Sequence, residues 1–221
     1  MLTILQQRTL KYSFKLLLKI KRKLKRDQNL DAYYFGYGAN LSIDRFRKWH
    51  IPAEIVGTAF IKNYKIKFNL PCEYKGKGFA GIEQSQGEMV WGILFKVNSK
   101  ALKMLDVLEW VPFNFYERKL FVVMQNEETF KNVHSYVTSN PQYNLVPSKA
   151  YLDFIINSGI RANFPKYYLD ELSSTPTKNN FELDTTFVLR NPSRKRIFIE
   201  SLSQLYLFHD KLREKLARLI P

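Results

Sequence analysis

Seven short runs rich in β-branched and aromatic residues follow one another between residues 32 and 138, with few helical patterns between them. Residues typical of turns separate several of the runs, at Lys62-Asn63, Pro71, Gly76 and Ser85-Gln86-Gly87. The pattern predicts an α+β fold, a small, mixed and mostly antiparallel sheet or closed β-barrel with flanking helices. The runs are residues 32–37, 53–60, 64–69, 78–83, 89–97, 119–124 and 132–138.

The positive charge of the chain is concentrated at its two ends. Of the formal net charge of +15, residues 1–30 contribute nine basic and one acidic side chain, and residues 190–221 contribute eight and three. Residues 31–189 hold eighteen basic and sixteen acidic side chains and are nearly neutral. We therefore predict three parts: a basic helical extension at 1–30, a barrel domain at 31–175 and a C-terminal extension at 176–221 with an amphipathic helix.

Residues 10–26 have the pattern of a basic amphipathic helix, with Leu10, Phe14, Leu17 and Leu24 on one stripe among lysines. Three partners fit this pattern: an anionic membrane surface, a nucleic acid or acidic protein, and the remainder of this chain. Of the two external surfaces, the membrane is favoured over nucleic acid. Leucines three and four apart between 202 and 219 favour helix packing, against the N-terminal helix, the core, or a second subunit in a homodimer.

Cysteine and histidine are scarce in this sequence. Cys72 is the one cysteine, which excludes an internal disulfide, and the three histidines show no metal-ligand spacing. A reducing, cytoplasmic location fits this composition best. The N-terminus lacks the pattern of a secretory signal, and no apolar run is long enough to cross a bilayer.

An aromatic run ends at the glycine-containing segment Gly36-Tyr37-Gly38-Ala39-Asn40-Leu41, and the helix expected over residues 42–49 has Ser42 as its N-cap. A strand that ends at glycines and continues into a helix directs backbone N–H groups and the positive end of the helix dipole at one place. Such a turn is an anion-binding site in some proteins. In many others it is only a junction.

The helix expected from Asn98-Ser99 to about Trp110 carries one acidic residue in its apolar stripe. Glu109 follows Leu102 by seven residues and Leu105 by four, which places its carboxylate on the buried side, whereas Asp106 is turned partly away. A carboxylate in apolar surroundings has a raised pKa, as proton transfer at neutral pH requires. The alternative is that Glu109 ends the stripe and reaches solvent.

Two more helices are expected, over 149–158 with Gly159 at the C-terminal end and over 165–172.

Several motifs follow one another along the chain: Tyr34-Phe35-Gly36-Tyr37-Gly38-Ala39-Asn40-Leu41, Gly81-Ile82-Glu83, Gly87-Glu88-Met89-Val90-Trp91-Gly92, Leu105-Asp106-Val107-Leu108-Glu109-Trp110-Val111-Pro112, Tyr116-Glu117-Arg118, Ser135-Tyr136 and Pro147-Ser148. In that order they resemble the gamma-glutamylcyclotransferase-like family over residues 33–172. That resemblance implies a small mixed barrel with flanking helices, no cofactor and no metal, and a small-molecule gamma-glutamyl amide as substrate. The reaction it implies is attack of the substrate's own α-amine on the γ-carbonyl, which releases 5-oxoproline and an amine or amino acid.

The resemblance also assigns roles to particular residues. Glu109 is the expected general acid and base, which takes a proton from the α-amine and returns it to the leaving amine. The backbone of the turn from Gly36 through Tyr37, Gly38, Ala39 and Asn40 to Leu41 is expected to hold the substrate α-carboxylate. Tyr136 matches a family tyrosine near the substrate and is expected to orient the glutamyl end or to donate to the oxyanion.

Two positions depart from the family pattern. Ala39 stands where serine is usual, and Trp110 stands where glycine commonly follows the glutamate. The leaving group is therefore open among glutathione-like peptides, gamma-glutamyl amino acids and gamma-glutamyl amines. The departures also motivate a second hypothesis, a non-catalytic member of the family that binds a ligand or partner and reaches membranes or acidic partners through its basic ends.

Overall fold

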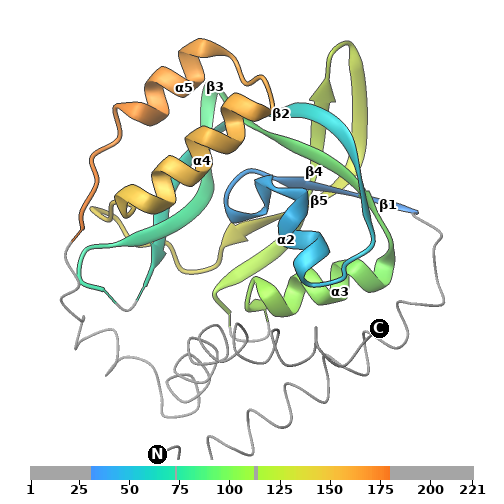
Figure 1. Cartoon of the computed structure of the whole chain (residues 1–221), viewed down its shortest axis with the longest axis horizontal. Helices are drawn as coiled ribbons and strands as arrows, with labels where there is room; N and C mark the ends of the chain where they lie inside the picture. Colours follow the sequence, from blue (N-terminus) through green and yellow to red (C-terminus); the bar gives the residue numbers. More distant parts are fainter. Residues whose placement is uncertain (1–30, 73, 112–113, 180–221) are drawn as a thin grey trace, which may run out of the picture. The chain divides into compact units, whose positions relative to one another are not determined.

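The computed structural model describes residues 31–72, 74–111 and 114–179 (Figure 1). The predicted basic helix at 10–26, the predicted helix at 202–219 and the membrane, nucleic-acid and dimer contacts assigned to them lie outside the described residues. The described elements are β1 Ala32–Gly36, the 3₁₀ turn η1 Ala39–Leu41, α2 Ile43–Lys48, β2 Ala53–Pro71, β3 Gly78–Val97, α3 Ser99–Leu108, β4 Tyr116–Gln125, β5 Glu128–Thr138, α4 Lys149–Arg161 and α5 Lys166–Ser173.

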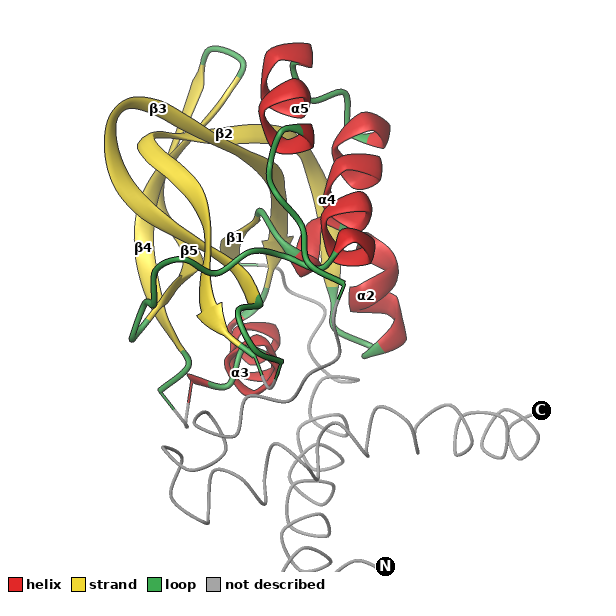
Figure 2. Cartoon of the chain, turned by 90° about the vertical axis from the view of Figure 1, so that its left-hand side faces the viewer, coloured by secondary structure: helices red, strands yellow, loops and turns green. Residues whose placement is uncertain are grey.

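The strands close into a barrel in the order β1-β3-β2-β4-β5. Four of the pairings are antiparallel, and the parallel contact of β1 with β5, at Tyr34 and His134, completes the ring. The predicted α+β fold with a mixed, mostly antiparallel barrel is therefore confirmed. Figure 2 shows α2, α4 and α5 on one side of the barrel and α3 below the strands at one end.

Within the described residues there are five strands rather than the seven that the sequence predicts, because two pairs of expected strands are continuous. β2 and β3 are 19 and 20 residues long and pair as one hairpin. The predicted turns at Lys62-Asn63 and at Ser85-Gln86-Gly87 are wrong. The register shifts between Lys62 and Tyr64, and the backbone N–H of Gly87 donates to the Asn63 side chain at 3.0 Å. An irregularity of this kind bends a strand without ending it.

α2, α3 and α4 begin where the sequence predicts, and α5 begins at Lys166, one residue after the predicted start. Ser42, Asn98 and Ser148 cap α2, α3 and α4, and each side chain accepts a backbone N–H of the first turn. The predicted end of α4 at Gly159 is wrong, because the helix continues to Arg161. Gly159 instead permits close packing, since an added Cβ would lie 2.6 Å from the ring of Phe164.

The buried core consists largely of aromatic and aliphatic side chains. Phe35, Phe46 and Phe95 are among the largest side chains that are almost fully buried. The ring centroid of Phe46 on α2 lies 4.6 Å from that of Phe95 on β3 and 6.0 Å from that of Tyr34 on β1. This contact fixes α2, and with it the turn before α2, to the strands.

Candidate active site

Glu109 lies at the C-terminal end of α3, where it is the C-cap residue. Leu105 and Leu102, which lie one and two turns earlier on the same side of the helix, are buried in the core. Only 13% of the Glu109 side chain is exposed. The predicted position of this carboxylate, on the buried stripe and near the end of the helix, is confirmed.

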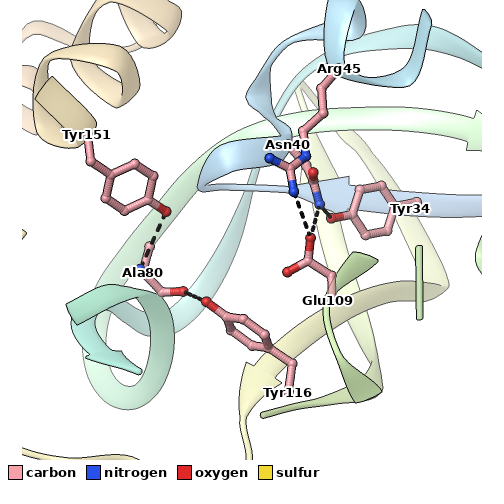
Figure 3. A network of polar contacts seen from close by, with 7 residues as sticks. All are labelled: Tyr34, Asn40, Arg45, Ala80, Glu109, Tyr116 and Tyr151. Carbon is pink, nitrogen blue, oxygen red and sulfur yellow. Dashed lines mark hydrogen bonds and ion pairs between the residues drawn. The ribbon is translucent and has the colours of Figure 1, made fainter. Parts of the chain in front are cut away.

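Two side chains from the segment after β1 reach the same oxygen of Glu109 (Figure 3). Asn40 Nδ2 donates to Oε1 at 2.9 Å, and Arg45 Nη2 lies 3.8 Å from Oε1. Asn40 Nδ2 also donates to the hydroxyl of Tyr34 at 2.7 Å. The other carboxylate oxygen faces, in this view, the side of the site on which Ala80 and Tyr116 lie.

The surroundings of Glu109 change its acidity. Burial raises the pKa of the Glu109 carboxyl above its ordinary value, and the charge of Arg45 and the hydrogen bond from Asn40 lower it by less. The net effect is a raised pKa. A carboxyl in this state can both accept and release a proton closer to neutral pH than an exposed glutamate can.

Asn40 has a buried acceptor that no other described residue satisfies. Asn40 is 4% exposed, and its side-chain oxygen Oδ1 has no hydrogen-bond partner within the described part of the chain. The amide nitrogen is fixed by Tyr34 and Glu109, so Oδ1 cannot exchange places with it without losing both bonds. A buried acceptor of this kind is costly unless a donor fills it. It fits a ligand N–H group close to the Glu109 carboxylate.

The turn at Gly36–Leu41 is tightly packed. A Cβ on Gly36 would lie 2.6 Å from the backbone oxygen of Asn40, and one on Gly38 would lie 3.1 Å from the Tyr151 hydroxyl. Glycine is therefore required at position 36 by the close approach of the Asn40 backbone, whereas a side chain at position 38 would need its neighbours to shift by a few tenths of an ångström. The chain makes the short turn η1 before α2 begins, so the turn does not lead directly into that helix.

Two tyrosines bind the backbone of Ala80 on β3. Tyr116 donates to the Ala80 oxygen at 2.6 Å, and the Ala80 N–H donates to the Tyr151 hydroxyl at 3.4 Å. Burial raises the pKa of Tyr151 to about 12, and it raises the pKa of Tyr116 and of Tyr34 further. All three hydroxyls therefore keep their protons at physiological pH, and Tyr116 donates its proton to the Ala80 oxygen.

Tyr136 on β5 lies beside the site with its hydroxyl engaged. It donates to Asp106 Oδ1 at 2.9 Å, and Arg118 Nε lies 3.3 Å from the same oxygen. Its ring is 5.8 Å from that of Tyr34. The Tyr37 hydroxyl donates to the backbone oxygen of Tyr136 at 2.7 Å.

The structure thus brings Asn40 and Glu109 into contact and places the turn backbone and Tyr136 around them. The apolar side chain of Leu41 is buried in the core, and the Tyr37 hydroxyl is bonded to the Tyr136 backbone, so we consider only the backbone of these two residues for the site. Sequence reasoning assigned no role to Arg45, Tyr116 or Tyr151. The sequence could have indicated Arg45, because this residue lies one helical turn after Ser42, the N-cap of α2. The approach of Tyr151 to Gly38 depends on how α4 packs, which no local pattern reveals.

Trp110 follows Glu109 with a φ of 56°, in the left-handed region that favours glycine. This gives a physical reason for the glycine that is common after the family's glutamate. The indole ring of Trp110 packs edge-on against Phe115, with ring centroids 5.0 Å apart. The departure at Trp110 therefore combines an unfavourable backbone conformation with an aromatic contact.

Two negative findings apply to residues 31–72, 74–111 and 114–179 only. They contain no group of three or more histidine, cysteine, aspartate or glutamate side chains placed to hold a metal ion. Within the same ranges, every helix is too short or too polar to cross a membrane.

The fold and site define a class of small closed-barrel proteins with a largely buried glutamate at the barrel end. Residues 89–172 match the model of the AIG2-like family. Bovine gamma-glutamylcyclotransferase is 30% identical over 155 residues, which cover 67% of this chain and 81% of that protein. The human gamma-glutamylcyclotransferase is also 30% identical, over 64% of this chain and 77% of its own length.

A solved structure described as gamma-glutamyl cyclotransferase shares the fold, with a TM-score of 0.61 and 24% identity, over 72% of this chain and 99% of its own. The chain belongs to the gamma-glutamylcyclotransferase-like family of enzymes.

The raised pKa of Glu109 predicts how a Glu109→Gln substitution changes stability with pH. A carboxyl whose pKa is higher in the folded protein stabilises the fold below its unfolded pKa, about 4.3, and loses that contribution as pH rises through the folded value. The glutamine protein should therefore gain stability over wild type as pH increases. Urea unfolding of both proteins from pH 4 to 8 measures this, and a difference that stays constant or falls with pH would contradict it.

Proposed function

We propose that the protein cleaves gamma-glutamyl amides by intramolecular attack of the substrate α-amine on the γ-carbonyl, with release of 5-oxoproline and an amine or amino acid. The observation that carries this proposal is the Glu109 carboxyl, largely buried, raised in pKa and bonded through one oxygen to Asn40. The names of the bovine and human relatives support the same reaction.

The chemistry needs little beyond a proton carrier and correct positioning, because the nucleophile and the carbonyl belong to one molecule. A bond forms between the α-nitrogen and the γ-carbon, and the bond from that carbon to the leaving nitrogen breaks. Overall, two protons pass from the α-ammonium to the leaving nitrogen. We assign their transfer to Glu109, which accepts protons from the first nitrogen and donates them to the second.

The remaining polar groups suit the other parts of such a substrate. We assign Asn40 Oδ1, which has no hydrogen-bond partner within the described residues, to accept an N–H of the α-amine while Glu109 takes a proton from it. We assign the α-carboxylate to the backbone of the Gly36–Leu41 turn. The Tyr151 hydroxyl accepts the Ala80 N–H and keeps its own proton, so it is a candidate donor to the oxyanion. Tyr136, whose proton bonds to Asp106, is assigned to shaping the wall of the site.

Release of 5-oxoproline from a panel of gamma-glutamyl compounds tests this function. The panel contains glutathione, gamma-glutamyl-alanine and gamma-glutamyl-ethylamide, which differ in the leaving group only. We expect 5-oxoproline and the free amine in equal amounts from at least one of them, measured by chromatography. Free glutamate in place of 5-oxoproline would indicate hydrolysis and would contradict the cyclisation. If no compound reacts but one binds, the ligand-binding hypothesis replaces this one.

A further inference from the structure

The C-terminal end of α3 carries two acidic side chains that bind different parts of the barrel. Glu109 accepts a hydrogen bond from Asn40, in the turn after β1, at 2.9 Å. Asp106, three residues earlier, accepts the hydroxyl proton of Tyr136 on β5 at 2.9 Å, and its Oδ1 lies 3.3 Å from Arg118 Nε on β4. The end of the helix is therefore held by two separate sets of contacts.

The contacts of Asp106 come from one place in the sheet. Arg118 and Tyr136 are direct partners in the β4–β5 ladder, so a single cross-strand pair sets the position of both groups. Only 20% of the Asp106 side chain and 29% of the Arg118 side chain are exposed, and Tyr136 is 2% exposed. A hydrogen bond to a carboxylate is stronger than one between neutral groups, and burial reduces the competition from water. Asp106 is therefore a firm anchor for the helix.

Glu109 lies where the helix itself gives little support. α3 ends at Leu108, and Glu109 is followed by Trp110 in a left-handed conformation. Helices fray at their ends. The direction of the Glu109 side chain therefore depends on how firmly the preceding turn, which contains Asp106, is held.

Tyr136 also connects Asp106 to the groups that bind Glu109. Its ring centroid lies 5.8 Å from that of Tyr34. The Tyr34 hydroxyl accepts a hydrogen bond from Asn40 Nδ2 at 2.7 Å, and the same nitrogen donates to Glu109 at 2.9 Å. The contacts close a ring, from Asp106 through the two tyrosines and Asn40 to Glu109, and back along one turn of α3. A displacement of Asp106 or Tyr136 would therefore move Glu109 relative to Asn40.

We propose that Asp106 is a positioning residue: it anchors the end of α3 to β4 and β5, and this anchor fixes the direction of the Glu109 carboxylate. Asp106 acts through Glu109 and has no substrate contact in this assignment. A misplacement of about 1 Å costs up to about a hundredfold in rate, so a loosened helix end slows the reaction in a protein that still folds. The assignment rests on the proposed function where turnover is measured, and is independent of it where the carboxyl itself is measured.

Turnover of substituted proteins is the first test. Tyr136→Phe removes the hydroxyl that Asp106 accepts and changes no charge. With the gamma-glutamyl compound that reacts best, we expect kcat to fall about tenfold and KM to change by about twofold or less. Asp106→Leu should lose at least as much, whereas Asp106→Asn, which keeps an oxygen acceptor, should retain part of the activity. Full kcat in folded Tyr136→Phe and Asp106→Leu proteins would overturn the proposal.

A double variant tests whether the two residues act through one bond. Asp106→Leu combined with Tyr136→Phe should be about as slow as Asp106→Leu alone, because either substitution removes the hydrogen bond between them. Losses that multiply in the double variant would give the two residues separate roles and overturn the proposal.

The titration of the Glu109 carboxyl tests the anchor without any substrate. Burial raises the pKa of this carboxyl, and a loosened helix end exposes it to water. We therefore expect the pKa of Glu109 in Tyr136→Phe to be lower by about 0.5 or more, towards the ordinary value. Carbon-13 NMR of the side-chain carboxyl measures this pKa, and Glu109→Gln identifies the signal. A lower kcat with an unchanged pKa would assign Tyr136 directly to the substrate and overturn the proposal.

Asp170→Leu is the matched control for Asp106→Leu. Asp170 on α5 also has an ion pair, with Lys166 Nζ at 2.6 Å, and 62% of its side chain is exposed. Both kcat and the pKa of Glu109 should stay as in wild type. Thermal melts identify any variant that fails to fold, and Tyr136→Phe carries the test if Asp106→Leu does not fold.

The two measurements separate this proposal from the proposed function. A lower pKa of Glu109 in Tyr136→Phe, with no turnover of any compound by wild type, would support the Asp106 assignment and reject the proposed function. Turnover by wild type with an unchanged pKa of Glu109 in Tyr136→Phe would do the opposite.

Discussion

A Glu109→Gln protein is expected to fold like wild type and to release 5-oxoproline about 10²- to 10⁴-fold more slowly, the range typical of a lost general acid–base group. Glutamine has nearly the same shape and can still accept the hydrogen bond that Asn40 donates to Oε1. It cannot take up a proton from the α-amine. The loss should therefore appear mainly in kcat, measured under saturating substrate, with circular dichroism to compare the folds.

Glu127→Gln is the control for this substitution, since Glu127 is exposed in the turn between β4 and β5. It should keep wild-type turnover. The acid side of the wild-type kcat/KM profile should fall at a pH above the ordinary pKa of glutamate, because burial raises the pKa of Glu109. Full turnover in a folded Glu109→Gln protein would remove Glu109 from the mechanism.

A Phe46→Ala substitution is expected to destabilise the protein by about 3–5 kcal/mol, the usual cost of truncating a buried phenylalanine. Phe46 is 1% exposed, and its ring packs on Phe95 and Tyr34. The free energy of unfolding in urea measures the loss, which should appear as a lower midpoint with an unchanged m-value.

Leu120→Ala provides the comparison for Phe46→Ala. Leu120 on β4 is 57% exposed, so its truncation should change the free energy of unfolding by about 0.5 kcal/mol or less. Losses of equal size at the two positions would show that α2 is not fixed to the barrel by the Phe46 contact.

The fold class could be predicted from the sequence because strand runs and helix caps are local signals. Ser42 and Asn98 each marked a helix start correctly, and the helix expected from residue 149 begins there. The number of strands could not be predicted from the sequence, because residues such as Asn63 and Gly87 suit both a turn and a bulge. Which of the two forms depends on whether the partner strand continues alongside, and that is a property of the whole sheet.

The candidate site also contains some residues that local patterns predict and others that they do not. Glu109 could be found because burial of its carboxylate follows from helical periodicity. Asn40 could be found in the glycine-containing turn, but its bond to Glu109 joins residues 69 positions apart. Arg45 and Tyr151 belong to helices whose packing on the barrel decides where their side chains point. Such placement depends on tertiary contacts that a local pattern does not contain.

The parallel contact between β1 and β5 has a consequence for the order of folding. Tyr34 on β1 pairs with His134 on β5, across 100 positions of sequence, although β1 has an earlier partner in β3. During synthesis the chain can form the β2–β3 hairpin and add β1 long before β5 leaves the ribosome. Ring closure must wait for the last strand, and contacts between residues so distant in sequence form slowly. Until then one edge of β1 has no neighbour, and Tyr34, which helps to hold Asn40 at the candidate active site, lies on that edge.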